Sequence, residues 1–104
     1  MNIGVAIKYV RNQVGLSQED LSSKSGISQT SISQIENGIK SPSKKTVKKI
    51  CLVLQVPEAV LYIIGIENAD IPSSRKEVFD TVFPQIKELA IQIIGKKKSR
   101  LILE

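Results

Sequence analysis

The sequence predicts an all-α protein. Its apolar residues recur at intervals of three and four, which is the spacing of one helix face, and not at the interval of two that is typical of a strand. Helix-capping residues precede these stretches and glycines follow several of them. The 104 residues suit one small domain with an appendage. With 41% hydrophobic and 24% charged residues, the composition is that of a folded chain.

Three short helices are expected before residue 38. The first is indicated by apolar residues spaced by four, three and four: Ile3, Ile7, Val10 and Val14. Ser17 is the expected N-cap of the second helix, with Asp20 in the capping-box position and Gly26 at the end. Ser28 caps the third, which stops at Gly38. Two short helices joined across a glycine form a helix-turn-helix unit.

Two further helices complete the first predicted domain, residues 1–66. Ser43 is the expected N-cap of a fourth helix, whose inward face is Val47, Ile50, Cys51 and Leu54. Pro57 fits the first turn of a fifth helix, whose inward face is Val60, Leu61 and Ile64. The expected fold is therefore five helices followed by a separate C-terminal segment.

That C-terminal segment, residues 74–104, follows a polar connector at residues 67–73. Ser74 and Glu77 are expected to form a capping box, and Pro84 should kink or split the helix. Its apolar stripe is too wide to face water: Val78, Phe79, Val82, Phe83, Ile86, Leu89, Ala90, Ile93 and Ile94. The rest of the chain, a second copy or another protein must cover it, and a homodimer is favoured. The basic run KKKSR is interpreted as a solvated end.

Several classes of protein are excluded by what the sequence lacks. It has no histidine and one cysteine, Cys51, in an apolar run typical of a buried structural thiol. No catalytic constellation, metal site or cofactor motif is assembled from the residues present, so an enzyme is not expected. No stretch resembles a signal peptide or a membrane span, which predicts a cytoplasmic location. The net charge of +5 favours an anionic partner.

The third expected helix has an unusual exposed face. Its polar residues carry no charge: Gln29, Thr30, Ser33, Gln34 and Asn37. Solvent-facing helices are usually rich in Lys and Glu, which favour the helix more than Ser, Thr or Asn do. Uncharged amides and hydroxyls match the donors and acceptors on base edges in the major groove of DNA. A merely solvated polar face is the alternative.

Residues 16–56, LSQEDLSSKSGISQTSISQIENGIKSPSKKTVKKICLVLQV, resemble the lambda-repressor-like helix-turn-helix family of Cro and phage-type repressors (XRE type). The features that match are the Leu-Ser-Gln opening, the turn at Gly26, the Ile-Glu-Asn-Gly ending, Ser-Pro, and the apolar fourth helix. Ser22 departs from the family's usual Ala, although it is also small. The resemblance implies a five-helix lambda-repressor-like DNA-binding domain.

The resemblance also implies roles for individual residues. The base-reading positions fall on Gln29, Thr30 and Gln34, with Ser33 assisting. Gln18 and Asn37 match family positions that contact the DNA backbone. Lysines in the loop and fourth helix are expected to contact phosphates, or else form a solvated run: Lys40, Lys44 and Lys45, with Lys48 and Lys49 beyond them.

A structural ion pair is expected between the first and third helices. Arg11 and Glu36 match a family pair that joins these helices, and both lie near apolar faces. We expect the pair to position the third helix and not to touch bases. Two unrelated surface charges are the alternative.

These features together predict a sequence-specific DNA-binding transcriptional regulator. A dimeric repressor that reads a palindromic operator is favoured, with double-stranded DNA and a second copy as partners. Dimerisation is assigned to the C-terminal residues Val78, Phe79, Val82, Phe83, Ile86, Leu89 and Ile93. The alternative is an antitoxin-like protein whose C-terminal segment binds a partner protein while the N-terminal domain binds DNA.

Overall fold

The computed structural model describes the backbone of residues 1–103 and the side chains of residues 1–94. These residues form helices and no strand, so the predicted all-α class is confirmed. The first five helices are α1 (Ile3–Gln13), α2 (Gln18–Ser25), α3 (Gln29–Glu36), α4 (Lys44–Leu54) and α5 (Glu58–Gly65). Two 3-10 turns, η1 (Asn68–Asp70) and η2 (Ser73–Arg75), then lead into the long helix α6 (Lys76–Leu103).

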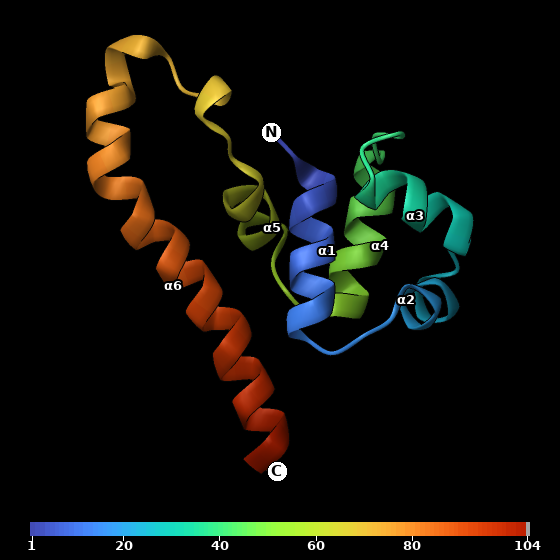
Figure 1. The fold of residues 1–104 in the computed structure, drawn as a ribbon. Helices are drawn as coiled ribbons and strands as arrows, with labels where there is room; N and C mark the ends of the chain where they lie inside the picture. Colours follow the sequence, from blue (N-terminus) through green and yellow to red (C-terminus); the bar gives the residue numbers. More distant parts are fainter. Residues whose placement is uncertain (104) are drawn as a thin grey trace.

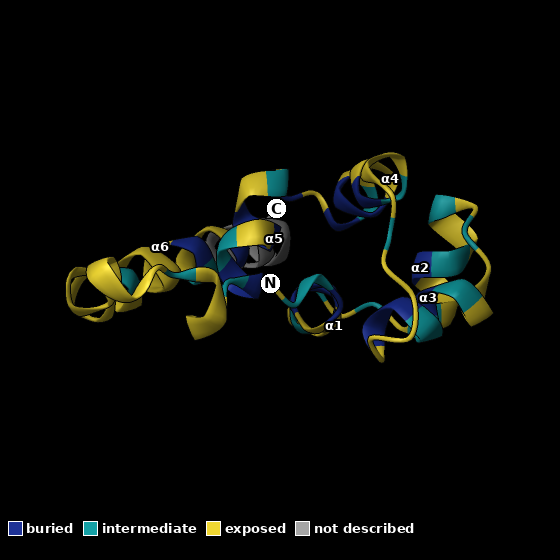
Figure 2. Cartoon of the chain, turned by 90° about the horizontal axis from the view of Figure 1, so that it is seen from above, coloured by how far each residue is buried: buried dark blue, intermediate teal, exposed yellow. Residues whose placement is uncertain are grey.

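The helices are arranged so that the helix-turn-helix and α6 lie on opposite sides of the molecule. Helices α1, α4 and α5 form the middle, with α2 and α3 on one side and α6 on the other (Figures 1 and 2). Helix α6 packs mainly against α5 and less against α1. The free part of α6, residues 76–89, which the core does not bury, therefore lies away from α3.

Serine side chains begin three of these helices as expected. Ser17 Oγ accepts the backbone N–H of Asp20 at 2.9 Å, and the Asp20 carboxylate accepts the backbone N–H of Ser17 at 3.0 Å. This reciprocal pair is a capping box. Ser28 and Ser43 each cap the next helix by accepting a backbone N–H three residues later, both at 3.1 Å.

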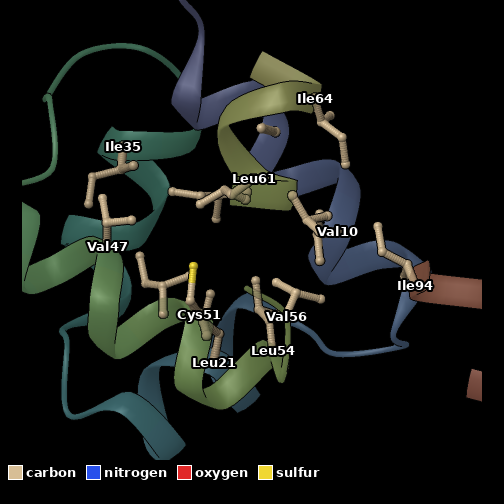
Figure 3. Packing of buried hydrophobic residues seen from close by; sticks show 14 of the residues in the cluster. Val10, Leu21, Ile35, Val47, Cys51, Leu54, Val56, Leu61, Ile64 and Ile94 are labelled. Carbon is tan, nitrogen blue, oxygen red and sulfur yellow. The ribbon is translucent and has the colours of Figure 1, made fainter. Parts of the chain in front are cut away.

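The hydrophobic core joins residues from all six helices (Figure 3). The inward faces predicted for α4 and α5 are buried as expected. From α6, Ala90 and Ile94 are each only 2% exposed and belong to the same cluster as Val10 of α1 and Ile64 of α5. Ala90 and Ile94 of α6 therefore belong to the same core as the first five helices.

Helix α1 approaches the end of α3 at Gly4. A Cβ atom at this position would lie 2.0 Å from the carbonyl oxygen of Ile35. That distance is far inside van der Waals contact, so only glycine fits at this point. The two backbones therefore set the separation between α1 and α3 directly.

The N-terminus is bound to the connector between α5 and α6. The Met1 ammonium donates hydrogen bonds to Glu67 Oε1 at 3.0 Å and Asp70 Oδ1 at 2.6 Å. The hydrogen bonds that the Met1 ammonium donates to Asp70 and Glu67 raise the pKa of the Met1 amine, and the contact with Asp70 also lowers the pKa of that carboxyl. The Asn2 N–H also donates to the Gly65 carbonyl at 2.7 Å. The connector's polar residues hold α1 and α5 together at this end.

The expected capping box at the start of α6 was wrong, and of the two outcomes expected at Pro84 the kink is seen and the split is not. Ser74 does not cap α6, because the 3-10 turn η2 occupies Ser73–Arg75 and α6 begins only at Lys76. Pro84 does not split it either, since α6 runs on through the proline. Figure 1 shows a change of direction in the N-terminal part of α6, which is the expected kink.

The apolar stripe of α6 divides into two parts. Ala90 and Ile94 are buried against α1 and α5, whereas five large aliphatic residues remain between 41% and 63% exposed: Val78, Val82, Ile86, Leu89 and Ile93. Figure 2 shows the end of α6 that lies farthest from the domain as mostly exposed. The side chains of the KKKSR run lie outside the described residues.

Candidate nucleic-acid interface

The turn between α2 and α3 is fixed by one glycine and one hydroxyl. Gly26 adopts a φ of 76°, the left-handed conformation that lets the chain leave α2 sharply. Ser22 Oγ donates to the Ile27 carbonyl at 2.6 Å, across the turn. The serine at this departure from the family pattern therefore adds a bond that alanine cannot make, and it ties the end of α2 to the entry of α3.

Helix α3 presents its uncharged polar residues on the side opposite its core residues. Ile32 and Ile35 are buried, while Gln29 and Thr30 are exposed and Ser33 and Gln34 are half-buried. Just beyond the helix, the Asn37 amide donates to Ser33 Oγ at 3.4 Å. The four residues assigned to base reading thus lie on one helix with solvent-accessible donors and acceptors.

The backbone of Gln34 also holds the loop that follows α3. Its carbonyl accepts the N–H groups of Ile39 at 2.9 Å and Lys40 at 3.2 Å. This places Lys40 at a fixed point after the helix. Further exposed lysines follow on α4: Lys44, Lys45, Lys48 and Lys49. Cations in the first turn oppose the helix dipole, at a cost of about 0.3–1 kcal/mol each, so helix stability does not explain them.

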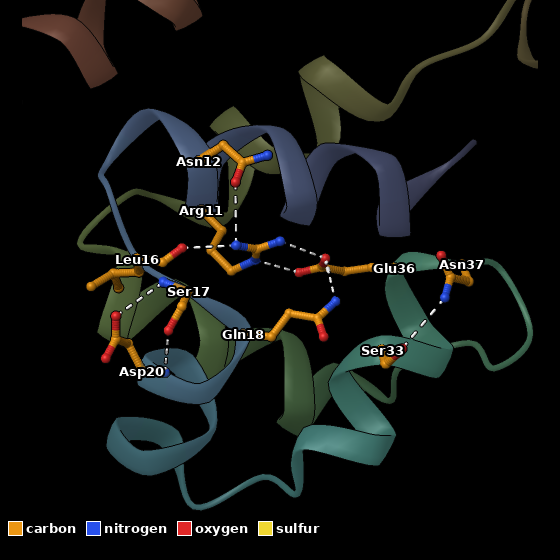
Figure 4. Close-up of polar contacts among 9 residues, drawn as sticks. All are labelled: Arg11, Asn12, Leu16, Ser17, Gln18, Asp20, Ser33, Glu36 and Asn37. Atoms are coloured by element: carbon orange, nitrogen blue, oxygen red, sulfur yellow. Dashed lines mark hydrogen bonds and ion pairs between the residues drawn. The ribbon is translucent and has the colours of Figure 1, made fainter.

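A buried ion pair joins α1 to the end of α3 (Figure 4). Arg11 Nε donates to Glu36 Oε2 at 2.7 Å, and its Nη2 donates to Oε1 at 2.9 Å, which makes the contact bidentate. The remaining Nη1 donates to the Leu16 carbonyl at 2.8 Å, in the turn before α2. One guanidinium therefore connects α1, the α1–α2 turn and α3.

Gln18 completes this network from α2. Its amide Nε2 donates to Glu36 Oε1 at 3.0 Å, so the side chain assigned to the DNA backbone is also bonded within the protein. Burial alone would raise the pKa of Glu36, but the hydrogen bonds from Arg11 and Gln18 and the charge of Arg11 outweigh it and lower that pKa. The Glu36 hydrogen bonds also raise the pKa of Arg11. Both groups are charged, and they fix α1, α2 and α3 relative to one another.

The described residues offer no sign of a reactive thiol, a metal site or a membrane-spanning helix. Cys51 is 5% exposed, and burial raises the pKa of its thiol to about 11, which suits a packing residue and not a nucleophile. Within the described side chains, no group of three or more His, Cys, Asp or Glu residues could hold a metal ion. No helix over the same residues is long and apolar enough to span a bilayer.

Sequence reasoning missed three structural features of this site. It assigned no role to Gly4 and considered only the small size of Ser22. It did not predict the hydrogen bond between Gln18 and Glu36. A glycine inside a helical pattern was the one available signal for Gly4. The hydrogen bonds of Ser22 and Gln18 depend on how α2 meets its neighbours, which the local sequence does not specify.

The fold and this network define a helix-turn-helix domain. The chain matches the helix-turn-helix family model over residues 7–61, more than half of its length, and it belongs to that family. It is also 33% identical over 80 residues to uncharacterized HTH-type transcriptional regulators from two strains of Mycobacterium tuberculosis, CDC 1551 / Oshkosh and ATCC 25618 / H37Rv. The match covers 76% of this chain but only 55% of each relative.

Proposed function

We propose that the protein is a sequence-specific DNA-binding transcriptional regulator that acts in the cytoplasm as a dimeric repressor. The observation that carries this proposal is the uncharged polar face of α3, held to α1 and α2 by the buried Arg11–Glu36 pair. The family match and the two related regulators support it. The role requires occupation of a promoter and no catalysis.

Specificity is assigned to α3. Glutamine can bond to adenine through N6 and N7 together, and hydroxyls can either donate or accept. Gln29 and Thr30 lie at the N-terminal end of α3, which is the part that enters the major groove in helix-turn-helix complexes. Ser33 and Gln34 follow one turn later. We therefore assign base reading to Gln29, Thr30, Ser33 and Gln34.

Affinity is assigned to the basic residues and amides around α3. Phosphate contacts supply most of the binding free energy and make it depend on salt. Residues 1–66 carry eight Lys and Arg against four Asp and Glu, a net +4 of the chain's +5. The proposed backbone contacts are Gln18, Asn37, Lys40, Lys44 and Lys45.

One helix-turn-helix domain contacts only a few base pairs, and a dimer would contact a longer operator. Two copies of α3 about 34 Å apart would read a palindrome, because the two-fold axis of the protein would match that of the operator. The surface proposed for dimerisation is the set of apolar residues on α6 that the core does not bury: Val78, Phe79, Val82, Phe83, Ile86, Leu89 and Ile93. These residues are half-buried or exposed in the single chain.

The same exposed α6 residues support a second candidate function. An antitoxin-like protein would use them to bind a different protein while the N-terminal domain binds DNA. A purified chain that is monomeric but forms a stable complex with a partner through α6 would favour this function over the dimeric repressor.

The experiment that tests the proposal is selection from a random duplex pool with the purified chain at about 150 mM salt, near physiological ionic strength. A two-fold symmetric motif is the expected result. A double variant, Gln29→Ala with Gln34→Ala, is the control, because it removes two amides from α3 without touching the core. Recovery of no motif by the wild-type chain would contradict sequence-specific binding, and an unsymmetric motif would contradict the dimer alone.

A further inference from the structure

An apolar groove runs between the end of α5, the connector and the free part of α6. It has a volume of about 540 Å3. One wall includes Ile63, Ile66 and Ile71, which are half-buried, and the other includes Val78, Val82 and Ile86. Arg75 is the one charged residue among those that line it. A groove with two apolar walls that faces water is normally the seat of a binding partner.

The walls of the groove restrict the chemistry of its occupant. Residues 74–94 carry three basic and three acidic residues, so this part of the chain has no net charge to attract DNA. Phe79 and Phe83 stack with ring centroids 4.4 Å apart and present a broad apolar surface to the groove. The occupant must therefore be apolar, elongated along α6 and without a large net charge.

Helix α6 itself has such a surface. At 100° per residue, the exposed residues at 78, 82, 86, 89 and 93 fall within one arc of about 80°. The buried Ala90 and Ile94 lie on the neighbouring arc and face the domain core. A second copy therefore offers an apolar helical ridge of the required length. Because residues 74–94 of each copy carry no net charge, two copies do not repel each other along this stretch.

We propose that the groove of each copy receives α6 of a second copy, so that each apolar ridge packs into the other's groove about a two-fold axis. This inference rests on the dimer of the proposed function and specifies its interface. A simple pairing of two α6 helices would leave Ile63, Ile66 and Ile71 facing water. Insertion of the ridge covers both walls, and the same patch serves both copies, as a closed two-fold dimer requires.

This interface would set the distance between the two α3 helices. Helix α6 is not a loose tether, because Ala90 and Ile94 hold it in the core beside α1 and α5. A contact made through Val78, Val82 and Ile86 is therefore transmitted by one continuous helix to the DNA-binding domain. The two half-sites of the operator would then tolerate little change in their spacing.

Cross-linking between two single-cysteine variants tests the inserted arrangement. Ile71→Cys and Val82→Cys are each made in a Cys51→Ala background, mixed, and treated with a short bismaleimide. A mixed product that joins position 71 of one copy to position 82 of the other is expected. If only copies bearing Val82→Cys cross-link to each other, the ridges pair directly and the groove proposal is wrong, while the dimer stands.

Sedimentation of the full chain supplies the second measurement. Ile71→Asp changes a groove wall in the connector and should convert the dimer to monomers. Leu52→Asp is the matched control, because Leu52 is 78% exposed on α4 outside the groove, and it should keep the wild-type mass. Circular dichroism checks that both variants fold. An unchanged mass for Ile71→Asp would overturn the inference. A monomeric wild-type chain would overturn both the inference and the proposed dimer. Selection from the duplex pool measures DNA recognition separately in either case.

Discussion

Arg11 Nε lies 2.7 Å from Glu36 Oε2, with less than a tenth of either side chain exposed to solvent. The pair joins two helices whose closest approach is already limited by the glycine at position 4. Buried ion pairs are weak evidence for stability, because desolvation offsets most of the attraction, but they fix geometry. We therefore regard this pair as the device that orients α3.

Removal of the guanidinium should destabilise the fold strongly. In Arg11→Leu the Glu36 carboxylate stays buried and keeps only the hydrogen bond from Gln18. Loss of one partner of a buried pair costs about 3–5 kcal/mol. Urea denaturation monitored by circular dichroism measures the free energy of unfolding. The double variant Arg11→Leu with Glu36→Leu should be closer to the wild type in stability, yet bind the selected duplex more weakly. A double variant with full DNA affinity would contradict the orienting role.

Acidification should remove the stabilisation that Glu36 supplies. Its pKa in the folded chain lies below the ordinary value of 4.5, so the folded state binds its proton less readily than the unfolded state. The contribution is therefore complete above the ordinary value and is lost as pH falls through the folded pKa. We expect the free energy of unfolding to fall as the pH drops below 4.5, the ordinary pKa of the glutamate.

The variant Glu36→Gln isolates this residue from the other carboxylates. Asp20 and Asp70 also have lowered pKa values, so part of the acid loss belongs to them. Glu36→Gln should be less stable than the wild type at neutral pH but lose less stability on acidification. An equal loss in both proteins over the same pH range would show that Glu36 does not contribute.

The variant Gly4→Ala should destabilise the protein although it improves helix propensity. Gly4 is the second residue of α1, so the gain in helix propensity stays below the value of about 1 kcal/mol for a helix interior. The new Cβ would lie 2.0 Å from the Ile35 carbonyl oxygen, a backbone atom that cannot rotate away. Overpacking of this kind costs about 1–3 kcal/mol, so the clash should win. Val5→Ala is the control, because Val5 is 54% exposed on the same helix. A rise in melting temperature for Gly4→Ala would contradict the close approach.

The serine caps of α2, α3 and α4 and the core faces of α4 and α5 could be predicted from the sequence because they depend on neighbouring residues. Ser17 and Asp20 are three residues apart, and the buried positions of α4 repeat at helical intervals. The same reasoning failed at the start of α6, where Ser74 lies inside the 3-10 turn η2 and the α-helix begins only at Lys76. The residue pattern does not show that a 3-10 turn leads directly into the helix.

The division of the α6 stripe could not be predicted because its residues are chemically alike. Ala90 and Ile94 are buried while Val82 and Ile93 are exposed, yet all four fit one broad helical face. Only the direction in which the connector leaves α5 determines which arc meets the domain. The hydrogen bond from Gln18 to Glu36 has the same origin, since it requires α2 to be placed against α3.

Neutralisation of a lysine at the start of α4 should weaken DNA binding in a salt-dependent manner. If Lys45 contacts a phosphate, Lys45→Gln should reduce the slope of log K against log salt by about one unit. The same change should leave the fold equally or slightly more stable, because it removes a cation from the first turn of a helix. Lys87→Gln on α6 is the control and should leave the slope unchanged. An unchanged slope for Lys45→Gln would indicate a solvated lysine.

Truncation of one amide on α3 should alter sequence preference more than overall affinity. The side chain of Gln34 is half-buried. The hydrogen bonds that hold the following loop are accepted by its backbone carbonyl, which Gln34→Ala retains, so this variant should keep the structure of the site. Loss of one base contact should cost about 1–3 kcal/mol at a single base pair and relax the preference there. Binding to the selected duplex and to its single-base variants measures this, with the exposed Gln85→Ala on α6 as the control. An equal loss of affinity for every duplex would place Gln34 on the DNA backbone and not on a base.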